Sequence, residues 1–279
     1  MKELTAAQIE DFRTSIRNYY QDNGREFAWR STDNPYEILV SEFMLQQTQV
    51  QRVASKYRPF LRRFPAVDSL AVGPLKDVLG LWSGLGYNRR ALALFRTAKL
   101  LITNFAGLVP KSPDELCSLP GIGRATAGAI CAFAHNKPVV FVETNIRRVF
   151  IHFFFKKALS VHDKELLPLV DQTLDRINPR HWYYALMDFG SMLKDLRINP
   201  NKKSVHFHRQ ARFENSDRQV RGLIIRFLLA QGAIRETDLA RLIGFDPERT
   251  NTIVQQLLSE GFLMRHEDKI SVAHGLSRT

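Results

Sequence analysis

One glycine-rich segment of the chain is well suited to hold a phosphate group. It reads Leu119-Pro120-Gly121-Ile122-Gly123-Arg124-Ala125-Thr126-Ala127. Two glycines around one apolar residue permit a tight turn into a helix, and the first N–H groups of a helix have no partner within it. These donors at the positive helix end can bind a phosphate oxygen. The segment therefore predicts a phosphate-binding hairpin, with an ordinary helix–turn–helix corner as the alternative.

A carboxylate stands directly before the next predicted helix, in the segment Phe141-Val142-Glu143-Thr144-Asn145-Ile146-Arg147-Arg148-Val149. A negative charge beside a sugar stabilises positive charge that develops on that sugar during bond cleavage. A phosphate-binding turn followed by a carboxylate is the combination that an enzyme needs to hold a nucleic acid and act on a nearby sugar.

A second carboxylate, Glu42, lies upstream in Pro35-Tyr36-Glu37-Ile38-Leu39-Val40-Ser41-Glu42-Phe43-Met44-Leu45-Gln46-Gln47-Thr48-Gln49-Val50. At helical spacing it shares one inward face with Ile38, Leu39, Leu45 and Gln49. A carboxyl group among apolar neighbours loses hydration and binds its proton more tightly, so it can act as a general acid near neutral pH. The alternative is a structural ion pair with an arginine. The adjacent glutamines favour the first reading, because amides can read base edges.

The composition indicates a polyanionic partner. The 279 residues include 40 Lys and Arg against 28 Asp and Glu, which gives a net charge of +12. The start of the chain lacks an apolar signal core and no run reaches membrane-spanning length, so we expect a prokaryotic cytoplasmic protein associated with its DNA. The two cysteines, Cys117 and Cys131, are expected to be buried packing residues, since two thiols cannot hold a cluster or a zinc ion.

Helical spacing dominates the first two thirds of the chain. Helices are predicted over residues 6–21, 35–54, 56–63, 67–72, 74–81, 88–105, 112–117, 124–134, 145–155, 162–175 and 179–193. A basic segment follows, which includes His206 and His208. We interpret residues 1–196 as an all-helical, two-lobed domain and residues 197–218 as a basic linker or loop.

The last part of the chain predicts a small α+β domain over residues 219–279. Three helices over residues 219–231, 237–244 and 247–260 precede a β-hairpin over residues 261–272, which is a winged-helix pattern with residues 249–258 in the recognition position. Such a domain could contact flanking duplex through Arg241, Arg249, Arg265 and Lys269, or it could bind a protein. The fold class is thus mainly α, with one small winged helix.

Four co-linear motifs resemble those of the helix-hairpin-helix (HhH-GPD) DNA glycosylases, and most closely those of the MutY-type adenine glycosylases. They are Ser41-Glu42-Phe43-Met44-Leu45-Gln46-Gln47-Thr48-Gln49-Val50, Leu81-Trp82-Ser83-Gly84-Leu85-Gly86-Tyr87, residues 119–128, and Met187-Asp188-Phe189-Gly190. The resemblance covers about residues 10–195, with the motifs in the family's order and spacing.

The resemblance implies a role for each matching residue. Glu42 takes the place of the family's catalytic glutamate, which protonates the departing base, and Glu143 that of its catalytic aspartate. Asn145 matches an asparagine that supports this site. Tyr87 matches a tyrosine wedged into the base stack beside the flipped base. The remaining implied DNA-binding residues lie near the flipped base or at the hairpin: Gln46, Gln47, Gln49, Gly121, Gly123, Arg124, Thr126 and Arg147.

The chain departs from the family pattern at four places. Glu143 is one methylene longer than the usual aspartate. Ala125 stands where bifunctional relatives carry a lysine, so strong strand-nicking lyase activity is not expected. Lys194 stands about where the first ligand of the family's iron–sulfur cluster would be, so no cluster is expected, although a structural monovalent cation at the hairpin remains compatible with the resemblance. The last 60 residues do not resemble the family's domain for 8-oxoguanine recognition.

Together these patterns predict a monofunctional DNA glycosylase that acts as a monomer on double-stranded DNA with a mismatched or damaged base. Adenine opposite 8-oxoguanine or guanine is the leading substrate. Two alternatives remain open at the level of sequence: a glycosylase for thymine or uracil mismatches or another modified base, and a non-catalytic lesion-binding or regulatory protein. A non-catalytic binding protein would gain nothing from two carboxylates facing a phosphodiester, so the pair Glu42 and Glu143 argues against that alternative.

Overall fold

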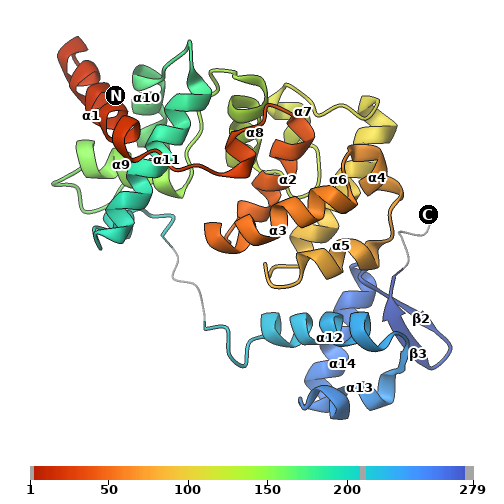
Figure 1. Cartoon of the computed structure of the whole chain (residues 1–279). Coiled ribbons are helices and arrows are strands. Elements are labelled where there is room, and N and C mark those ends of the chain that lie inside the picture. Colours follow the sequence, from red (N-terminus) through yellow and green to blue (C-terminus); the bar gives the residue numbers. More distant parts are fainter. Residues whose placement is uncertain (1–2, 208–211, 274–279) are drawn as a thin grey trace. The chain divides into compact units, whose positions relative to one another are not determined.

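Helices make up nearly all the regular structure in the described residues, 3–207 and 212–273, of the computed structural model (Figure 1). The mainly helical fold class is therefore confirmed. The chain forms two compact units, each built from two segments. One contains Met1–Glu42 and Pro110–Arg209, and the other contains Phe43–Val109 and Gln210–Thr279. His208, part of the predicted basic linker, lies outside the described residues.

The first unit is built around α11 (Pro179–Asp195), which packs against the neighbouring helices α1, α8 and α9. Its other elements are α1 (Ala6–Asn23), η1 (Ala28–Arg30), the start of α2 (Pro35–Leu45), α7 (Pro113–Cys117), α8 (Arg124–His135), α9 (Thr144–Phe154), α10 (Asp163–Thr173) and η2 (Pro200–Lys203). Aromatic rings fill the space between α1, α9 and α11. The Phe12 ring centroid lies 5.2 Å from that of Phe150 and 5.9 Å from that of Trp182. This apolar packing fixes the helices that carry the polar residues of the unit.

The second unit combines four helices with a C-terminal module. The helices are α3 (Val50–Arg63), α4 (Val67–Val72), α5 (Leu75–Trp82) and α6 (Arg89–Phe105), and α6 packs against both α4 and α5. Trp82 is fully buried, and its ring centroid lies 6.2 Å from that of Phe60.

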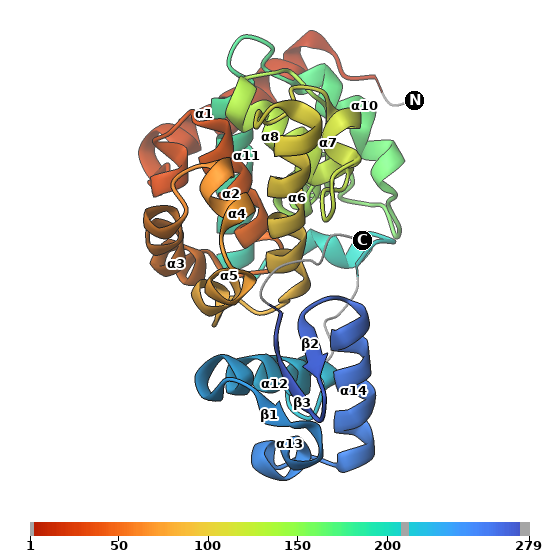
Figure 2. The same ribbon diagram turned by 90° about the vertical axis from the view of Figure 1, so that its right-hand side faces the viewer.

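The C-terminal module, Asp217–Ala273, has the element order of a winged helix (Figure 2). The helices α12 (Asp217–Gln231), α13 (Glu236–Ile243) and α14 (Pro247–Ser259) precede the hairpin of β2 (Leu263–His266) and β3 (Lys269–Val272), which confirms the predicted elements. Sequence patterns missed β1 (Ile234–Arg235), since two residues carry no detectable period. The antiparallel sheet has the strand order β1-β3-β2.

The predicted helix over residues 35–54 is wrong, because the chain turns at residues 46–49. α2 ends at Leu45, Gln47 adopts a left-handed conformation with φ 52°, and Gln49 is the N-cap of α3. The buried side chain of Arg90, which belongs to α6, binds carbonyl oxygens at the C-terminal end of α2. Its Nη1 atom donates to the carbonyl oxygens of Phe43 and Met44 at 2.9 and 3.0 Å. The helical spacing of the side chains continues through the glutamines, so periodicity alone could not show this break.

The expectation that both cysteines are buried needs correction. Cys117 is exposed at the end of α7, whereas Cys131 is buried in α8, where burial raises the pKa of its thiol to about 11. The segment after α11 contains the short helix η2, and its assignment as a basic linker or loop stays a prediction. Asn201 of η2 is buried and donates from Nδ2 to the Thr144 carbonyl oxygen at 2.9 Å, which anchors this segment to the start of α9.

Gly190 of α11 is expected to be irreplaceable, because a Cβ atom there would lie 2.6 Å from the Asn145 carbonyl oxygen and 2.7 Å from its Cβ atom. Gly190→Ala should therefore lower the free energy of unfolding by about 1–3 kcal/mol, measured by chemical denaturation. The matched control is Gly80→Ala in α5, where a Cβ meets nothing within 4 Å and no loss is expected. Equal effects of the two substitutions would contradict this close packing of α11 on α9.

Candidate active site

The carboxylate of Glu143 is held at the N-terminus of α9. Its Oε1 atom accepts hydrogen bonds from the backbone N–H groups of Asn145 and Ile146, at 2.7 and 2.8 Å. The Asn145 side chain donates from Nδ2 to Oε2 at 3.4 Å. Glu143 is thus the N-cap of α9, and the longer side chain folds back onto the helix that follows it. This position gives the carboxylate a fixed place and a favourable helix dipole.

Glu42 lies in α2, two positions after the buried Val40 and directly before the buried Phe43. Burial, with a smaller contribution from the charge of Glu143, raises the pKa of the Glu42 carboxyl group to about 8, and the charge of Arg30 opposes the rise. At neutral pH most of the Glu42 population therefore carries its proton. The residue as a whole is half-buried.

The two carboxyl groups differ in what surrounds them. Burial raises the pKa of Glu143 above its ordinary value too, and the N–H groups of Ile146 and Asn145 and the charges of Arg147 and Arg148 oppose part of that rise. Donors of this kind favour the ionised form. The two carboxyl groups therefore lie within range of each other's charge, and the hydrogen-bond donors that favour the ionised form surround Glu143 and not Glu42.

Asp188 binds two arginines, and one of them, Arg30, acts electrostatically on Glu42. Asp188 is buried in α11, and its carboxylate accepts hydrogen bonds from Arg30 at 2.8 Å and from the Nε atom of Arg25 at 2.7 Å. Burial by itself would raise the pKa of Asp188, but these arginines outweigh that effect and lower it. The Arg30 guanidinium also lies over the Tyr184 ring, with its central carbon 4.5 Å from the ring centroid. This cation is therefore fixed where it moderates the proton affinity of Glu42.

The contact of α9 with α11 positions Asn145. The buried Arg148 side chain donates to Asn145 Oδ1 at 2.8 Å and to the Gly190 carbonyl oxygen at 2.5 Å. The Asp-x-Gly motif of α11 therefore has two structural functions. Asp188 holds Arg30, whose charge acts on Glu42, and Gly190 admits α9, the helix capped by Glu143. The sequence analysis found the motif but assigned no role to Arg30, Arg148 or these two residues.

The glycine segment forms a turn between α7 and α8, as predicted. Gly121 has φ +77°, a conformation that side chains rarely adopt, and Gly123 is the N-cap of α8. Ile122 between them is buried and anchors the turn. Arg124 is exposed and Thr126 half-buried in the first turn of α8.

The residues expected to approach the flipped base lie in two turns of the second unit. Gln46 is half-buried, and Gln47 and Gln49 are exposed. Tyr87 is half-buried and left-handed, with φ 50°. Arg90 ties the two turns together, since its Nη2 atom donates to Thr48 Oγ1 at 2.8 Å and to the Gly86 carbonyl oxygen at 3.0 Å.

Arg147 is engaged within the protein. Its guanidinium forms a two-pronged ion pair with Asp163, with N–O distances of 2.7 and 2.6 Å. The pair is largely shielded from solvent and links α9 to α10. The DNA-binding role expected for Arg147 stays a prediction, and the observed contact gives this residue a structural function.

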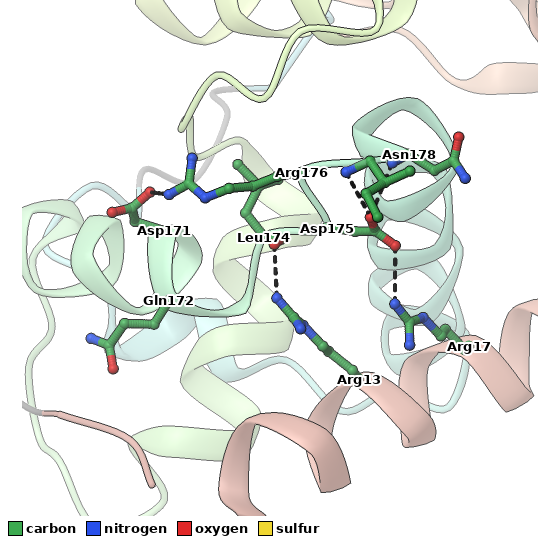
Figure 3. Close-up of a pocket in the computed structure, with 9 residues that line it drawn as sticks. Arg13, Arg17, Asp171, Gln172, Leu174, Asp175, Arg176 and Asn178 are labelled. Atoms are coloured by element: carbon green, nitrogen blue, oxygen red, sulfur yellow. Dashed lines mark hydrogen bonds and ion pairs between the residues drawn. The ribbon is translucent and has the colours of Figure 1, made fainter. Parts of the chain in front are cut away.

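A surface pocket of about 430 Å³ lies between α1 and the end of α10 (Figure 3). Its polar groups bind one another. Arg17 pairs with Asp175 at 3.0 Å, Arg176 pairs with Asp171 at 2.6 Å, and Arg13 donates to the Leu174 carbonyl oxygen. None of the residues that line it is a predicted site residue, so this pocket gives no second candidate for the active site.

The sequence of this chain is similar to those of known DNA repair proteins. Residues 40–177 match the sequence profile of the HhH-GPD superfamily base excision DNA repair proteins. The adenine DNA glycosylase of Mycolicibacterium smegmatis is 30% identical over 276 residues, which cover 91% of this chain and 92% of that protein. The chain belongs to the HhH-GPD superfamily. Its relatives within the superfamily are the MutY-type adenine DNA glycosylases.

Other relatives carry the same name. The adenine DNA glycosylase of Buchnera aphidicola subsp. Baizongia pistaciae is 40% identical over 194 residues, and this chain spans 54% of its length. The chain spans about half the length of two further Buchnera relatives as well.

Solved structures support the fold. A thermostable thymine-DNA glycosylase matches with a TM-score of 0.62 at 24% identity, over 72% of this chain and 94% of that one. A non-covalent endonuclease III–DNA complex matches with a TM-score of 0.53 at 22% identity, over 68% and 86%.

Glu42→Gln should stabilise the fold, and more so at high pH. Because the folded-state pKa is about 8 and the ordinary value is 4.5, ionisation of Glu42 is penalised only in the folded state. The penalty is absent at pH values below the ordinary pKa and grows as the pH rises toward the folded-state pKa. Above the folded-state pKa it remains at its full size. The gain in unfolding free energy should therefore be near zero at about pH 4 and on the order of a few kcal/mol at about pH 9.

Thermal or chemical denaturation of wild type and variant at both pH values measures this gain. Glu115→Gln removes a charge from an exposed site on α7 and serves as the control. A gain that does not grow with pH, or the same gain in the control, would show that Glu42 does not bind its proton tightly in the folded protein.

Proposed function

We propose that this protein is a monofunctional DNA glycosylase that excises adenine opposite 8-oxoguanine or guanine in base excision repair. The observation that carries the proposal is the pairing of protonated Glu42 with the capped carboxylate of Glu143 in one unit. A protein that only bound DNA would not need a carboxyl group that keeps its proton at neutral pH. The names of the relatives supply adenine as the base.

In this proposal the two carboxyl groups have different roles. Glu42 donates its proton to a ring nitrogen of the adenine, and the bond between that base and C1′ of the sugar breaks with both electrons going to the base. The negative charge of Glu143 stabilises the positive charge left on the sugar. A water molecule then adds to C1′, and the proton that it releases returns to the Glu42 carboxylate. The products are free adenine and an abasic site.

A covalent route through the protein is not expected, because Ala125 supplies no amine to attack C1′. The proposal therefore assigns weak or no lyase activity to this chain.

The family's iron–sulfur cluster does not fit the donors of this chain. The sequence has two cysteines, Cys117 on α7 and Cys131 in α8, and four thiolates hold such a cluster. No group of three or more His, Cys, Asp or Glu suited to a metal occurs among residues 3–207 and 212–273. The contact of Asn201 with Thr144 supplies a metal-free anchor for the segment after α11. We propose that the enzyme works without a cluster.

The proposed partner is double-stranded DNA with a mismatched or damaged base, bound by a monomer. Arg124, Thr126 and the turn at Gly121 and Gly123 would hold a backbone phosphate at the start of α8. Tyr87 would fill the gap left by the flipped adenine, near the glutamines at positions 46, 47 and 49.

No helix of the described residues combines the length and apolarity that a membrane crossing requires. We propose that the protein acts in the cytoplasm of a prokaryote, where its DNA is.

Incubation with labelled duplexes tests the proposal. The panel contains A opposite 8-oxoguanine, A opposite G, T opposite G and U opposite G, and each sample is divided and treated with or without hot alkali. We expect alkali-dependent cleavage of the adenine strand alone, and its loss in Glu42→Gln with DNA affinity retained. Cleavage at T or U would show that thymine or uracil, and not adenine, is the excised base. Tight binding without cleavage of any duplex would favour a lesion-binding protein.

Gly123→Val should weaken binding to every duplex alike, because the side chain would occupy the space of a phosphate. In the free protein the change is tolerated. A Cβ at Gly123 meets nothing within 4 Å, and its φ of −93° and ψ of 174° are extended values that valine adopts readily. Fluorescence anisotropy and thermal denaturation measure affinity and stability. An effect that depends on DNA sequence, or none at all, would contradict phosphate binding at this turn.

A further inference from the structure

Tyr87 is in contact with an arginine from a distant part of the chain. Arg218, in the first turn of α12, donates from Nη1 to Tyr87 Oη at 2.5 Å. The central carbon of its guanidinium lies 5.3 Å from the centroid of the Tyr87 ring, and that of Arg90 lies 5.6 Å from the same centroid. Two cations therefore lie over this ring, one from α6 and one from the C-terminal module.

The contact belongs to a larger attachment of the C-terminal module to α6. The Glu260 carboxylate accepts hydrogen bonds from Arg89 at 3.0 and 2.7 Å and from Arg221 at 2.6 Å. Arg96 of α6 donates to the Glu260 carbonyl oxygen at 2.6 Å. Since α6 begins two residues after Tyr87, these bonds fix the start of α12 beside the turn that carries the ring.

The three arginines of the module that were expected to contact DNA bind acidic residues of the module itself. Arg249 pairs with Asp217 at 2.6 Å and Arg265 with Glu236 at 2.8 Å. Arg241 pairs with Asp238 at 3.1 Å. These pairs reduce the positive charge that α13, α14 and the hairpin present. Arg218, by contrast, contacts Tyr87 in one of the turns proposed to recognise the base.

We propose that Arg218 is a positioning residue for Tyr87, through which the C-terminal module sharpens discrimination between mispaired and paired DNA. This inference rests on the proposed function, in which the ring enters the base stack. A phenol on a left-handed backbone position can still rotate about its side-chain bonds. Stacking and a hydrogen bond from Arg218 restrict that rotation, so insertion beside a mismatch costs less conformational entropy. Paired DNA, which does not admit the ring, gains nothing from this restriction.

The test compares Arg218→Ala with Arg226→Ala, an exposed arginine of the same helix. Both remove one positive charge from α12. Dissociation constants are measured in a Glu42→Gln background for a duplex with A opposite 8-oxoguanine and for its fully paired counterpart. We expect Arg218→Ala to lower the preference for the mismatch by about 3- to 30-fold, the range for loss of a cation–π contact. Arg226→Ala should leave that preference unchanged.

A double-mutant cycle with Tyr87→Phe adds a readout that a merely structural role would not move. That variant keeps the ring and removes the hydroxyl group, so its effect on the preference should be smaller in the Arg218→Ala background than in the parent. Additive effects would overturn the inference. If Arg218→Ala does not fold, Arg218→Lys carries the test, because it keeps the charge and loses the planar stack. The same direction of change is expected, and an unchanged preference contradicts the proposal.

The two proposals fail differently. A wild-type protein that excises adenine and prefers the mismatch, while Arg218→Ala matches Arg226→Ala, overturns the role of Arg218 alone. A wild-type protein with neither excision nor preference overturns the proposed function.

Discussion

The burial of two carboxyl groups within range of each other's charge is the constraint on which the first unit depends. Ionisation of both would cost much free energy in a poorly hydrated site. The fold separates their roles by giving Glu143 two backbone N–H donors and leaving Glu42 to burial, with a pKa of about 8. Asp188 of α11 holds Arg30, whose charge limits the rise in the Glu42 pKa, and Gly190 admits α9, whose N–H groups bind Glu143.

The second unit depends on a different buried charge. Arg90 lies in the interior with a pKa lowered to about 10 by burial, and its hydrogen bonds go to backbone carbonyl oxygens and the Thr48 hydroxyl group. One side chain thus ends α2, shapes the glutamine loop and holds the turn before Tyr87. The C-terminal module reaches the same turn through Arg218, and Glu260 secures its attachment.

Local sequence patterns predicted most helices, the hairpin of the C-terminal module and, through four short motifs, the family. They succeeded because apolar periodicity, glycine turns and the spacing of short motifs are local signals. The catalytic roles of Glu42 and Glu143 stay a prediction. Local patterns failed where a distant residue decides the outcome. The turn at Gln47 depends on Arg90, and the roles of Arg30 and Arg148 depend on contacts with α11. Cys117 has apolar neighbours in sequence, yet the short helix that it ends leaves it exposed.

The pH dependence of adenine excision under single-turnover conditions tests the central claim most directly. If protonated Glu42 is the acid, the rate should be level near neutral pH and fall tenfold per pH unit above about 8, while the affinity for DNA changes little. The residual rate of Glu42→Gln should lack this descending limb. A wild-type rate that stays level or rises well above that pH, in protein that is still folded and bound to DNA, would contradict the assignment of Glu42 as the proton donor.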